Sequence, residues 1–260
     1  MFVRRNLIVT AAIAMAAMLA AACETVPITG RSQLNFIDPA TEAKLGAQAF
    51  AQVKAESKIS NDPQANETVR RVAMQLIKAN ALAGDWEFIV IDESKVNAFA
   101  LPGGYIAVYK PMLSVAQSDA ALATVIAHEI GHVIAHHGAE RISRSQLMEA
   151  GTEAASLLLG GVLPADQQTV AALLGAGVTF GVEMPFSRDQ EYEADRIGLM
   201  LMARAGYDPR EAVEFWKRMM ARGGGNAPPE LLSDHPSDEN RIQRLNELMP
   251  QALEVYRAAS

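Results

Sequence analysis

Apolar positions recur with a helical period in the part of the chain that follows residue 40. The pattern predicts one helix over residues 41–58, which an Asn-Asp-Pro triplet ends, and a second helix over residues 63–83. The second helix has the clearer apolar face, formed by Val69, Val72, Met74, Leu76 and Ile77. This face is expected to be buried against the rest of the domain.

The spacing of apolar residues then becomes that of β-strands. Residues 86–92 predict one strand, and two short apolar runs at 98–101 and 105–109 predict two more. A Pro-Gly-Gly turn joins the two short runs, and its glycines supply the positive φ that a tight turn needs. We therefore expect an antiparallel hairpin beside the first strand, and so a small antiparallel sheet.

Helical periodicity returns after the sheet and continues to the end of the chain. Ser118 fits the N-cap of a helix that Gly138 would end, and Ser187 with Gln190 fits a capping box. Helical segments are expected over residues 118–138, on to about 159, 187–205, from 208 onward, and from 237 toward 256. Helices, a small sheet and further helices predict one α+β domain that is mostly helical.

The segment from residue 157 to 181 is apolar and contains five glycines. It fits a mobile flap that faces the substrate, and it fits equally a buried helical hairpin with glycines at close contacts. A membrane hairpin is disfavoured because Asp166, Gln167 and Gln168 interrupt the apolar run.

The first 22 residues match a secretory signal peptide. Two arginines precede an uncharged apolar run over residues 7–22, which is too short for a comfortable membrane span. Cys23, the only cysteine, follows three alanines and resembles the acylated cysteine of exported lipoproteins; ordinary cleavage after Ala22 is the alternative. The next residue is Glu24, not the aspartate of inner-membrane retention signals, which favours the outer membrane.

The expected organisation is therefore a signal peptide over residues 1–22, an N-terminal tether over 23–40 with a lipid anchor at Cys23, and one domain over 41–260. Half of the residues are hydrophobic and a fifth are charged, as in a globular protein. The net charge of −7, without a basic cluster, argues against a nucleic-acid partner.

Four of the five histidines lie close together, and two of them form an H-E-x-x-H motif. His128 and His132 stand one turn apart, about 40° around a helix, so both rings can reach one metal ion. Glu129 points about 100° away from His128 and can act on a water without binding the metal. Two imidazoles and a carboxylate around zinc would leave a position open for water, whose pKa the ion lowers.

The third ligand must come from elsewhere in the chain. The extended motif with a third histidine fails, because Gly138 stands at that position. Glu191 and Asp195 share one face of the expected helix, whereas Glu193 points about 200° away from Glu191. One acid of the first pair can bind the metal and the other can accept a ring N–H from a ligand histidine. Spacing alone does not assign the two roles.

Four stretches of the chain together resemble a zinc peptidase family, metallopeptidase family forty-eight. They are HEIGHVIAHHGAER, NAFALPGGYIAVYK, FSRDQEYEADRIG and SDHPSDENRI. The family includes the CaaX prenyl endopeptidase, HtpX, the mitochondrial Oma-type protease and the periplasmic β-barrel assembly-enhancing protease, and this chain is most similar to its short exported lipoprotein branch. The resemblance implies a zincin-like domain whose H-E-x-x-H helix carries the active site.

The resemblance also assigns residues to roles. It implies one zinc ion per chain on His128, His132 and Glu191, with Glu129 as general base and Asp195 behind a ligand histidine. It implies for His235 either a gate over the water position or a group that stabilises the oxyanion; a surface histidine before a proline is the alternative.

The two histidines after the motif are expected to stay away from the metal. His136 is interpreted as a helix-end partner for a carbonyl or an acid. His137 is expected to point away from the metal and to be structural.

The function expected from these features is a zinc endopeptidase that cleaves extended or misfolded proteins in the periplasm, in envelope or outer-membrane protein quality control. The substrate would add as a strand to the predicted hairpin. The contact residues would be Asn97, Ala98, Phe99, Gly103, Gly104 and Tyr105. The alternatives are a non-proteolytic periplasmic chaperone or assembly adaptor with a structural zinc site, and a zinc hydrolase that acts on non-peptide amides.

Overall fold

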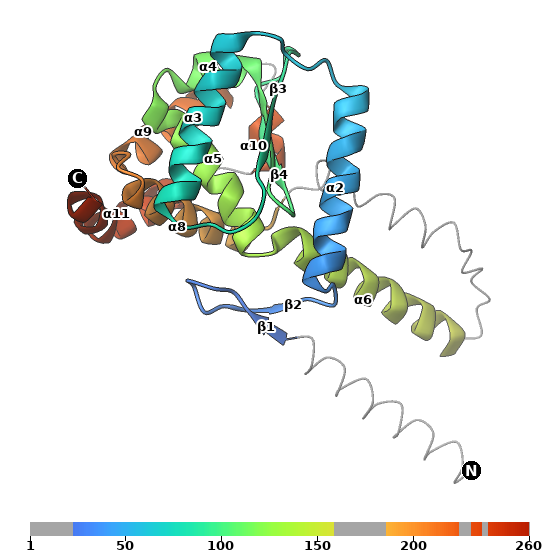
Figure 1. The fold of residues 1–260 in the computed structure, drawn as a ribbon. Helices are drawn as coiled ribbons and strands as arrows, with labels where there is room; N and C mark the ends of the chain where they lie inside the picture. Colours follow the sequence, from blue (N-terminus) through green and yellow to red (C-terminus); the bar gives the residue numbers. More distant parts are fainter. Residues whose placement is uncertain (1–22, 159–185, 224–229, 236–238, 260) are drawn as a thin grey trace, which may run out of the picture.

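The fold is described from a computed structural model of residues 23–158, 186–223, 230–235 and 239–259 (Figure 1). The predicted signal peptide and nearly all of the glycine-rich segment lie outside these ranges. Within them, helices surround a three-stranded sheet, so the predicted α+β class, mostly helical, is confirmed. None of the described helices is both long enough and apolar enough to cross a membrane.

The elements used below have the following bounds. The strands are β1 (Cys23–Thr25), β2 (Ser32–Leu34), β3 (Glu87–Ile91), β4 (Ala98–Leu101) and β5 (Tyr105–Tyr109). The helices are α2 (Pro39–Glu56), α3 (Pro63–Ala79), α4 (Lys110–Ala116), α5 (Asp119–Ile134), α6 (His137–Leu158), α8 (Arg188–Arg204), α9 (Arg210–Gly223), α10 (Glu230–Asp234) and α11 (Glu239–Ala259).

The main sheet has the strand order β3-β5-β4. β4 and β5 form the predicted antiparallel hairpin, but β3 pairs in parallel with β5, so the sheet as a whole is mixed and not antiparallel. The chain reverses between β3 and β4 and again at the Pro-Gly-Gly turn, and β5 then lies between the other two strands. Local apolar spacing does not determine this strand order, which is why the prediction was wrong on this point.

Alternate side chains of β5 face helices on opposite sides of the sheet. Ile106 and Val108 belong to the main core, which α3, α5 and α8 share. Ala107 and Tyr109 pack in a smaller cluster with Phe50 of α2. Figure 1 shows this arrangement, with α2 on one side of the sheet and α3 and α5 on the other. The sheet is therefore covered on both faces. β3 and β4 are its edge strands; an isolated bridge between Ile59 and Ile91 covers part of β3, and no described strand pairs with the outer edge of β4.

The helix that carries the H-E-x-x-H motif starts where expected but ends early. Ser118 caps α5 by accepting a hydrogen bond from the Ala121 N–H. The helix ends after Ile134, because His136 adopts a left-handed φ of 52°, and α6 begins at once with His137. Gly138 therefore lies inside α6 and does not cap α5, contrary to the prediction. The ring of His136 supports the break, because its Nδ1 lies 2.7 Å from Glu42 Oε2 on α2, the acidic partner that was expected.

Helices α5 and α8 cross at two glycines. A Cβ atom on Gly131 would lie 2.7 Å from the Ala194 carbonyl oxygen, and one on Gly198 would lie 2.9 Å from the His128 backbone nitrogen. Any side chain at either position would push the helix backbones apart. The two glycines thus let the acids of α8 approach the histidines of α5.

The predicted N-terminal tether is folded. β1 and β2 form an antiparallel pair in which Cys23 lies opposite Leu34, and Val26 is buried. Arg31 joins this hairpin to α6 and α8 through ion pairs with Glu140 and Glu193. We call residues 23–34 the N-terminal hairpin. The sequence pattern did not indicate that this part of the predicted tether binds to the domain, because the ion pairs join residues far apart in the chain.

Candidate metal centre

Helix α5 carries three functional side chains into the interior. His128, Glu129 and His132 are each less than 5% exposed, although they occupy consecutive turns of one helix. The helix runs through the core between the sheet and α8, so almost every side of it is covered. The motif therefore lies in a buried environment, where a bound ion keeps few competing waters.

Helix α8 brings the acids to these histidines. The predicted capping box of Ser187 and Gln190 is present and fixes the start of the helix. Glu191 and Asp195 follow one turn apart on the face that meets α5, and both are buried. The glycine contact described above sets the distance across which they reach the histidines.

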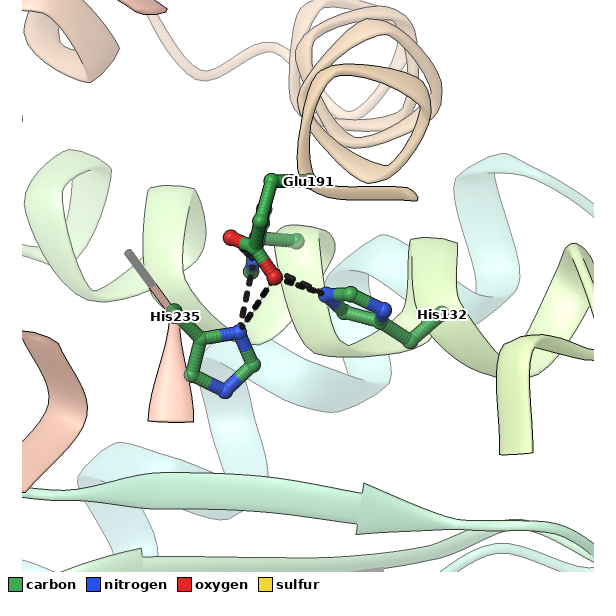
Figure 2. A group of neighbouring side chains, drawn as sticks. His132, Glu191 and His235 are labelled. Atoms are coloured by element: carbon green, nitrogen blue, oxygen red, sulfur yellow. Dashed lines mark hydrogen bonds and ion pairs between the residues drawn. The ribbon is translucent and has the colours of Figure 1, made fainter. Parts of the chain in front are cut away.

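Four ligand atoms converge on one small space. One nitrogen or oxygen from each of His128, His132, Glu191 and His235 lies within 4.8 Å of the others. Figure 2 shows Glu191 hanging from α8 with its carboxylate directed between the rings of His132 and His235. The glutamate oxygens lie 3.3 Å from His128 Nε2, 3.3 Å from His132 Nε2 and 3.0 Å from His235 Nδ1.

These separations fit a tetrahedral zinc site. Ligands at zinc distances of about 2.0–2.1 Å would be separated from one another by roughly 3.3 Å. The two ligand nitrogens of His128 and His132 are 3.1 Å apart, and His235 Nδ1 is 3.2 Å from His128 Nε2. Imidazole nitrogens and a carboxylate oxygen are also the donors that zinc prefers.

Two buried oxygens and the local charge support the same fit. Glu129 Oε1 and Glu191 Oε2 make no hydrogen bond of good geometry within the described part of the chain; their contacts there are ion pairs, Glu129 with His235 and Glu191 with Arg241 and His128. The pocket holds the buried carboxylates of Glu129, Glu191 and Asp195 against one buried guanidinium, that of Arg241. A divalent cation would balance the remaining negative charge.

The pKa values in the pocket show that it favours positive charge. Burial and the Arg241 charge oppose protonation of His128, but Glu191 and Asp195 outweigh them and raise its pKa to about 9. Burial opposes ionisation of Glu191, yet the charges of His235, His128 and Arg241 hold its pKa well below the ordinary value. The pocket therefore holds an ionised carboxylate and attracts a cation.

The other two groups of the motif have different pKa shifts. Burial lowers the pKa of His132 well below its ordinary value, which Glu191 only partly offsets, so this ring is neutral near pH 7 and has a lone pair to offer. Burial raises the pKa of Glu129 above its ordinary value. A raised carboxyl pKa suits a group that first accepts a proton and then returns it.

Asp195 and Arg241 stand behind His128. Asp195 Oδ1 lies 2.9 Å from His128 Nδ1, so it can accept the ring N–H that fixes the tautomer. Arg241 binds both oxygens of Asp195, lies 3.0 Å from Glu191, and stacks 3.4 Å over the ring of Trp216. Sequence reasoning assigned no role to Arg241. Its only signal was its place in the SDENRI stretch that carried the family resemblance.

His137 stands behind the other ring, contrary to the prediction that it points away. Its Nδ1 lies 2.8 Å from His132 Nδ1, and its Nε2 lies 3.1 Å from Glu193 Oε2. Glu193 points away from Glu191 around the helix, as expected, but meets α6 there and is buried. The prediction was wrong because it continued one straight helix through His136, where the chain turns.

His235 lies at the end of α10, beside the other ligand atoms. It is 2% exposed, so the interpretation as a surface histidine is wrong. Its Nδ1 faces the two motif histidines and Glu191, while its Nε2 lies 3.3 Å from Glu129 Oε1. A single ring thus touches both the ligand set and the proposed general base.

Only part of the predicted substrate strand is available for pairing. Ala98 and Phe99 lie on β4, the edge strand, and Asn97 precedes them with its side chain bound to Asp234. Gly104 and Tyr105 are excluded, because β5 is the central strand: the Gly104 carbonyl accepts from Glu87, and Tyr105 pairs with Glu87 on β3.

Gly103 lies in the turn beneath α2, where its φ is 92° and an added Cβ would lie 3.3 Å from the Ala43 carbonyl oxygen. The usable edge for an added strand is therefore shorter than predicted.

A mostly apolar cavity of about 70 Å³ opens between this edge and the metal centre. Its walls include Leu45, Ala49, Leu101, His132, Ile142 and Phe186. Phe186 stacks on the His132 ring at a centroid distance of 3.8 Å, which places the cavity directly beside a ligand candidate.

Comparison with known proteins finds one matching family model, peptidase family M48, over residues 60–249. The chain is 36% identical over 236 residues to the mitochondrial metalloendopeptidase OMA1 of Schizosaccharomyces pombe, covering 88% of this chain and 67% of that protein. It is 42% identical over 174 residues to the Arabidopsis thaliana protein of the same name, covering 66% and 34%. It is 29% identical over 267 aligned residues to the β-barrel assembly-enhancing protease of Escherichia coli K12, covering 96% and 54%. The chain thus spans about a third to two thirds of these relatives.

Proposed function

The chain belongs to peptidase family M48, whose members use zinc, and from this premise we propose that it is a zinc-dependent endopeptidase that cleaves extended or misfolded proteins. The observation that carries the proposal is the convergence of His128, His132 and Glu191 from two helices on one buried point. Glu129 lies on the same helix, where it can reach a water at that point without entering the ligand set.

In the proposed reaction, the zinc ion acts as the Lewis acid and a side chain of the protein transfers the proton. When bound, zinc supplies a Lewis acid that polarises a peptide carbonyl and makes water nucleophilic. Glu129 takes the proton of the attacking water and gives it to the leaving amine, a role that its raised pKa suits. The Ala100 N–H of β4 donates to the Glu129 carboxylate and orients it.

The substrate is held beside this carboxylate. An extended peptide adds along the outer edge of β4 through backbone hydrogen bonds, which is compatible with many sequences. Two N–H groups of this edge are already engaged within the chain, Ala98 with Asn97 Oδ1 and Ala100 with Glu129, so the substrate competes with these contacts. The apolar cavity next to His132 receives one apolar side chain of the substrate. Both features suit unfolded segments, because a folded protein keeps its strands paired and its apolar side chains buried.

The direct test replaces Glu129 by glutamine. The variant is expected to bind zinc and keep its fold but to cleave a casein-type unfolded protein at least ~100-fold more slowly than the wild type. Zinc content and cleavage with and without chelator are measured on the same preparation. Cleavage at the wild-type rate by the folded, zinc-loaded variant would overturn the proposal.

Two roles are considered for His235: a gate over the water position, or a group that stabilises the oxyanion. Its Nδ1 completes a four-membered ligand set, and a catalytic zinc site needs one open position, so the ring would have to move away as a gate. If it instead stabilises the oxyanion, His235→Ala should slow cleavage by roughly 10²–10³-fold. A gate predicts faster cleavage by the same variant, so the direction of the change separates the two roles.

The closed ligand set also supports a second function, a non-proteolytic chaperone or assembly adaptor with a structural zinc site. Structural zinc sites have four protein ligands, and four candidates meet here. Tightly bound zinc without turnover of an unfolded outer-membrane protein, even in the His235→Ala variant, would favour this function over proteolysis.

The third function considered, hydrolysis of non-peptide amides, would be identified by mass spectrometry of the reaction products.

We further propose that the chain acts in the periplasm, anchored to the outer membrane through Cys23, on misassembled envelope proteins. The signal-like start of the chain and the cysteine that follows it support export and acylation. The likeness to a β-barrel assembly-enhancing protease supports envelope substrates, whereas the likeness to mitochondrial relatives does not bear on them. Incorporation of a labelled fatty acid by the wild type but not by Cys23→Ser would support the anchor, and equal labelling would contradict it.

A further inference from the structure

The metal centre continues outward from His132 along a row of three side chains. The row starts at His132 Nδ1, passes through His137 and Glu193, and ends at Arg31 on the N-terminal hairpin. Glu193 lies on α8, and His137 opens α6. Each contact in the row is a hydrogen bond or an ion pair between parts of the chain that are distant in sequence, except the first.

Proton positions along this row are fixed by the need of His132 to bind metal through Nε2. A neutral ring with a free lone pair at Nε2 carries its proton on Nδ1. That proton can go only to His137 Nδ1, 2.8 Å away, which must then accept. His137 therefore carries its own proton on Nε2 and donates it to Glu193 Oε2, 3.1 Å away. All donors and acceptors in the row match in this one arrangement.

Glu193 is held in place from the far side. The side chains of Arg31 and Thr29 both donate to its carboxylate, the arginine at 2.5 Å. Arg31 also binds both oxygens of Glu140 on α6, at 2.8 and 2.9 Å. Glu140 and His137 are completely buried and Glu193 is 6% exposed, so water does not compete strongly for these contacts.

We propose that His137, Glu193 and Arg31 are positioning residues that hold His132 in its metal-binding tautomer and orientation, and that the N-terminal hairpin is thereby part of the metal site. This inference rests on the proposed function, because it concerns a ligand of the same zinc ion. The N-terminal hairpin, which begins at the expected lipid anchor, would then hold the ligand His132 in position, although the two are about 100 residues apart in the chain.

A neighbouring pair offers a matched control. His136 Nδ1 lies 2.7 Å from Glu42 Oε2, so this adjacent histidine also binds a buried carboxylate on another helix. Its ring makes no hydrogen bond to a ligand candidate within the described residues. His136→Asn therefore disturbs a similar ion pair at the same bend of the chain without touching the row, and asparagine tolerates the left-handed φ of 52° at this position.

The test measures the zinc affinity of the purified full-length chain by competition with a chromophoric chelator, with circular dichroism to verify folding. His137→Leu removes the row at similar bulk and is expected to weaken zinc binding by roughly 10–100-fold, as loss of a partner behind a ligand histidine does. His136→Asn is expected to bind zinc as the wild type does. Equal affinity of the two variants would overturn the proposal.

A conservative variant separates positioning from packing. The amide of His137→Gln can accept from His132 on its oxygen and donate to Glu193 on its nitrogen, so it should recover a large part of the affinity that His137→Leu loses. The absorption spectrum of the cobalt-loaded chain should return with it toward that of the wild type. Gln and Leu variants that bind zinc equally weakly while folded would mean that packing alone matters, and would overturn the proposal.

The far end of the row gives a variant that keeps the buried histidines intact. Arg31 is 27% exposed on its side chain, so Arg31→Gln should fold, release Glu193 and weaken zinc binding by a smaller factor than His137→Leu. Unchanged affinity in Arg31→Gln would remove the hairpin from the metal site.

Failure of this inference differs from failure of the proposed function. If the wild type binds no zinc, the proposed function fails first. If the wild type binds zinc and His137→Leu matches His136→Asn in zinc affinity, only the proposal about the row fails.

Discussion

His128 and His132 are the same residue type one helical turn apart, yet the chain supports them in different ways. Behind His128, Asp195 accepts directly from Nδ1, and Arg241 and Trp216 complete a support that lies wholly in the core. Behind His132, a second histidine comes first, and the row then leads outward to a partly exposed arginine.

Two ligand histidines in equivalent positions of one motif can therefore be held in place with unequal firmness by the surrounding structure. The support of His128 is built from α8, α9 and α11, whose positions depend on the main core. The support of His132 depends on a short hairpin whose Arg31 and Thr29 side chains bind Glu193. We therefore expect conditions or changes that loosen the N-terminal hairpin to act on His132 and to leave His128 in place.

The two arginines provide the sharpest contrast and the largest expected effect. Arg241→Met leaves the buried carboxylates of Glu191 and Asp195 without their cation, and should lower the free energy of unfolding by about 3–5 kcal/mol. Arg31→Met should cost less, about 1–3 kcal/mol, because the Arg31 head group is partly exposed although its partners Glu140 and Glu193 are buried. Denaturant unfolding of both variants in chelator measures the difference. Equal losses would mean that the two supports are not distinct.

The glycine contact should affect both ligands together. Gly131→Ala places a Cβ atom 2.7 Å from the Ala194 carbonyl oxygen, so α5 and α8 must separate, at a cost of about 1–3 kcal/mol. The separation also moves Glu191 away from both rings, so zinc affinity should fall as well. Gly138→Ala is the control, since nothing lies within 4 Å of an added Cβ there. A loss of stability in the control equal to that in Gly131→Ala would contradict this explanation.

The smallest expected effect is the part of the pH dependence that Glu193 contributes on the His132 side. Burial opposes ionisation of Glu193, but hydrogen bonds from His137, Thr29 and Arg31 hold its pKa at about 2. Since the folded pKa lies below the unfolded value, the stabilisation is complete above about pH 4.5 and is lost as the pH falls toward 2.

Glu193→Gln removes this titration. In chelator, its unfolding free energy should therefore fall less steeply than that of the wild type between about pH 4.5 and 2, by roughly 1–2 kcal/mol in total. Parallel curves for the two proteins would show that Glu193 does not carry the acid sensitivity.

The parts of this site that local spacing determines could be predicted from the sequence. His128, Glu129 and His132 lie on one helix because their spacing and the cap at Ser118 are local properties. Glu191 and Asp195 were expected on one face for the same reason. Their separate roles were not predictable, because these depend on how α8 crosses α5, a contact set by two glycines 67 residues apart in the chain.

The parts that sequence reasoning missed depend on long-range contacts. His137 was misjudged because a left-handed residue at 136 redirects the chain, and a periodic pattern does not reveal such a break. The role of Arg241 could not be predicted from its place on a helix, because it depends on contacts with Asp195, Glu191 and Trp216 that only the folded structure brings together. The parallel pairing of β3 with β5 likewise follows from strand order, which only the assembled sheet defines.

The position of the metal can be measured by anomalous scattering at the zinc absorption edge, in crystals of the zinc-loaded chain. We predict one strong peak per chain, about 2.0–2.2 Å from His128 Nε2, His132 Nε2 and a Glu191 oxygen. A peak elsewhere in the molecule, or none at these residues in zinc-loaded protein, would contradict it.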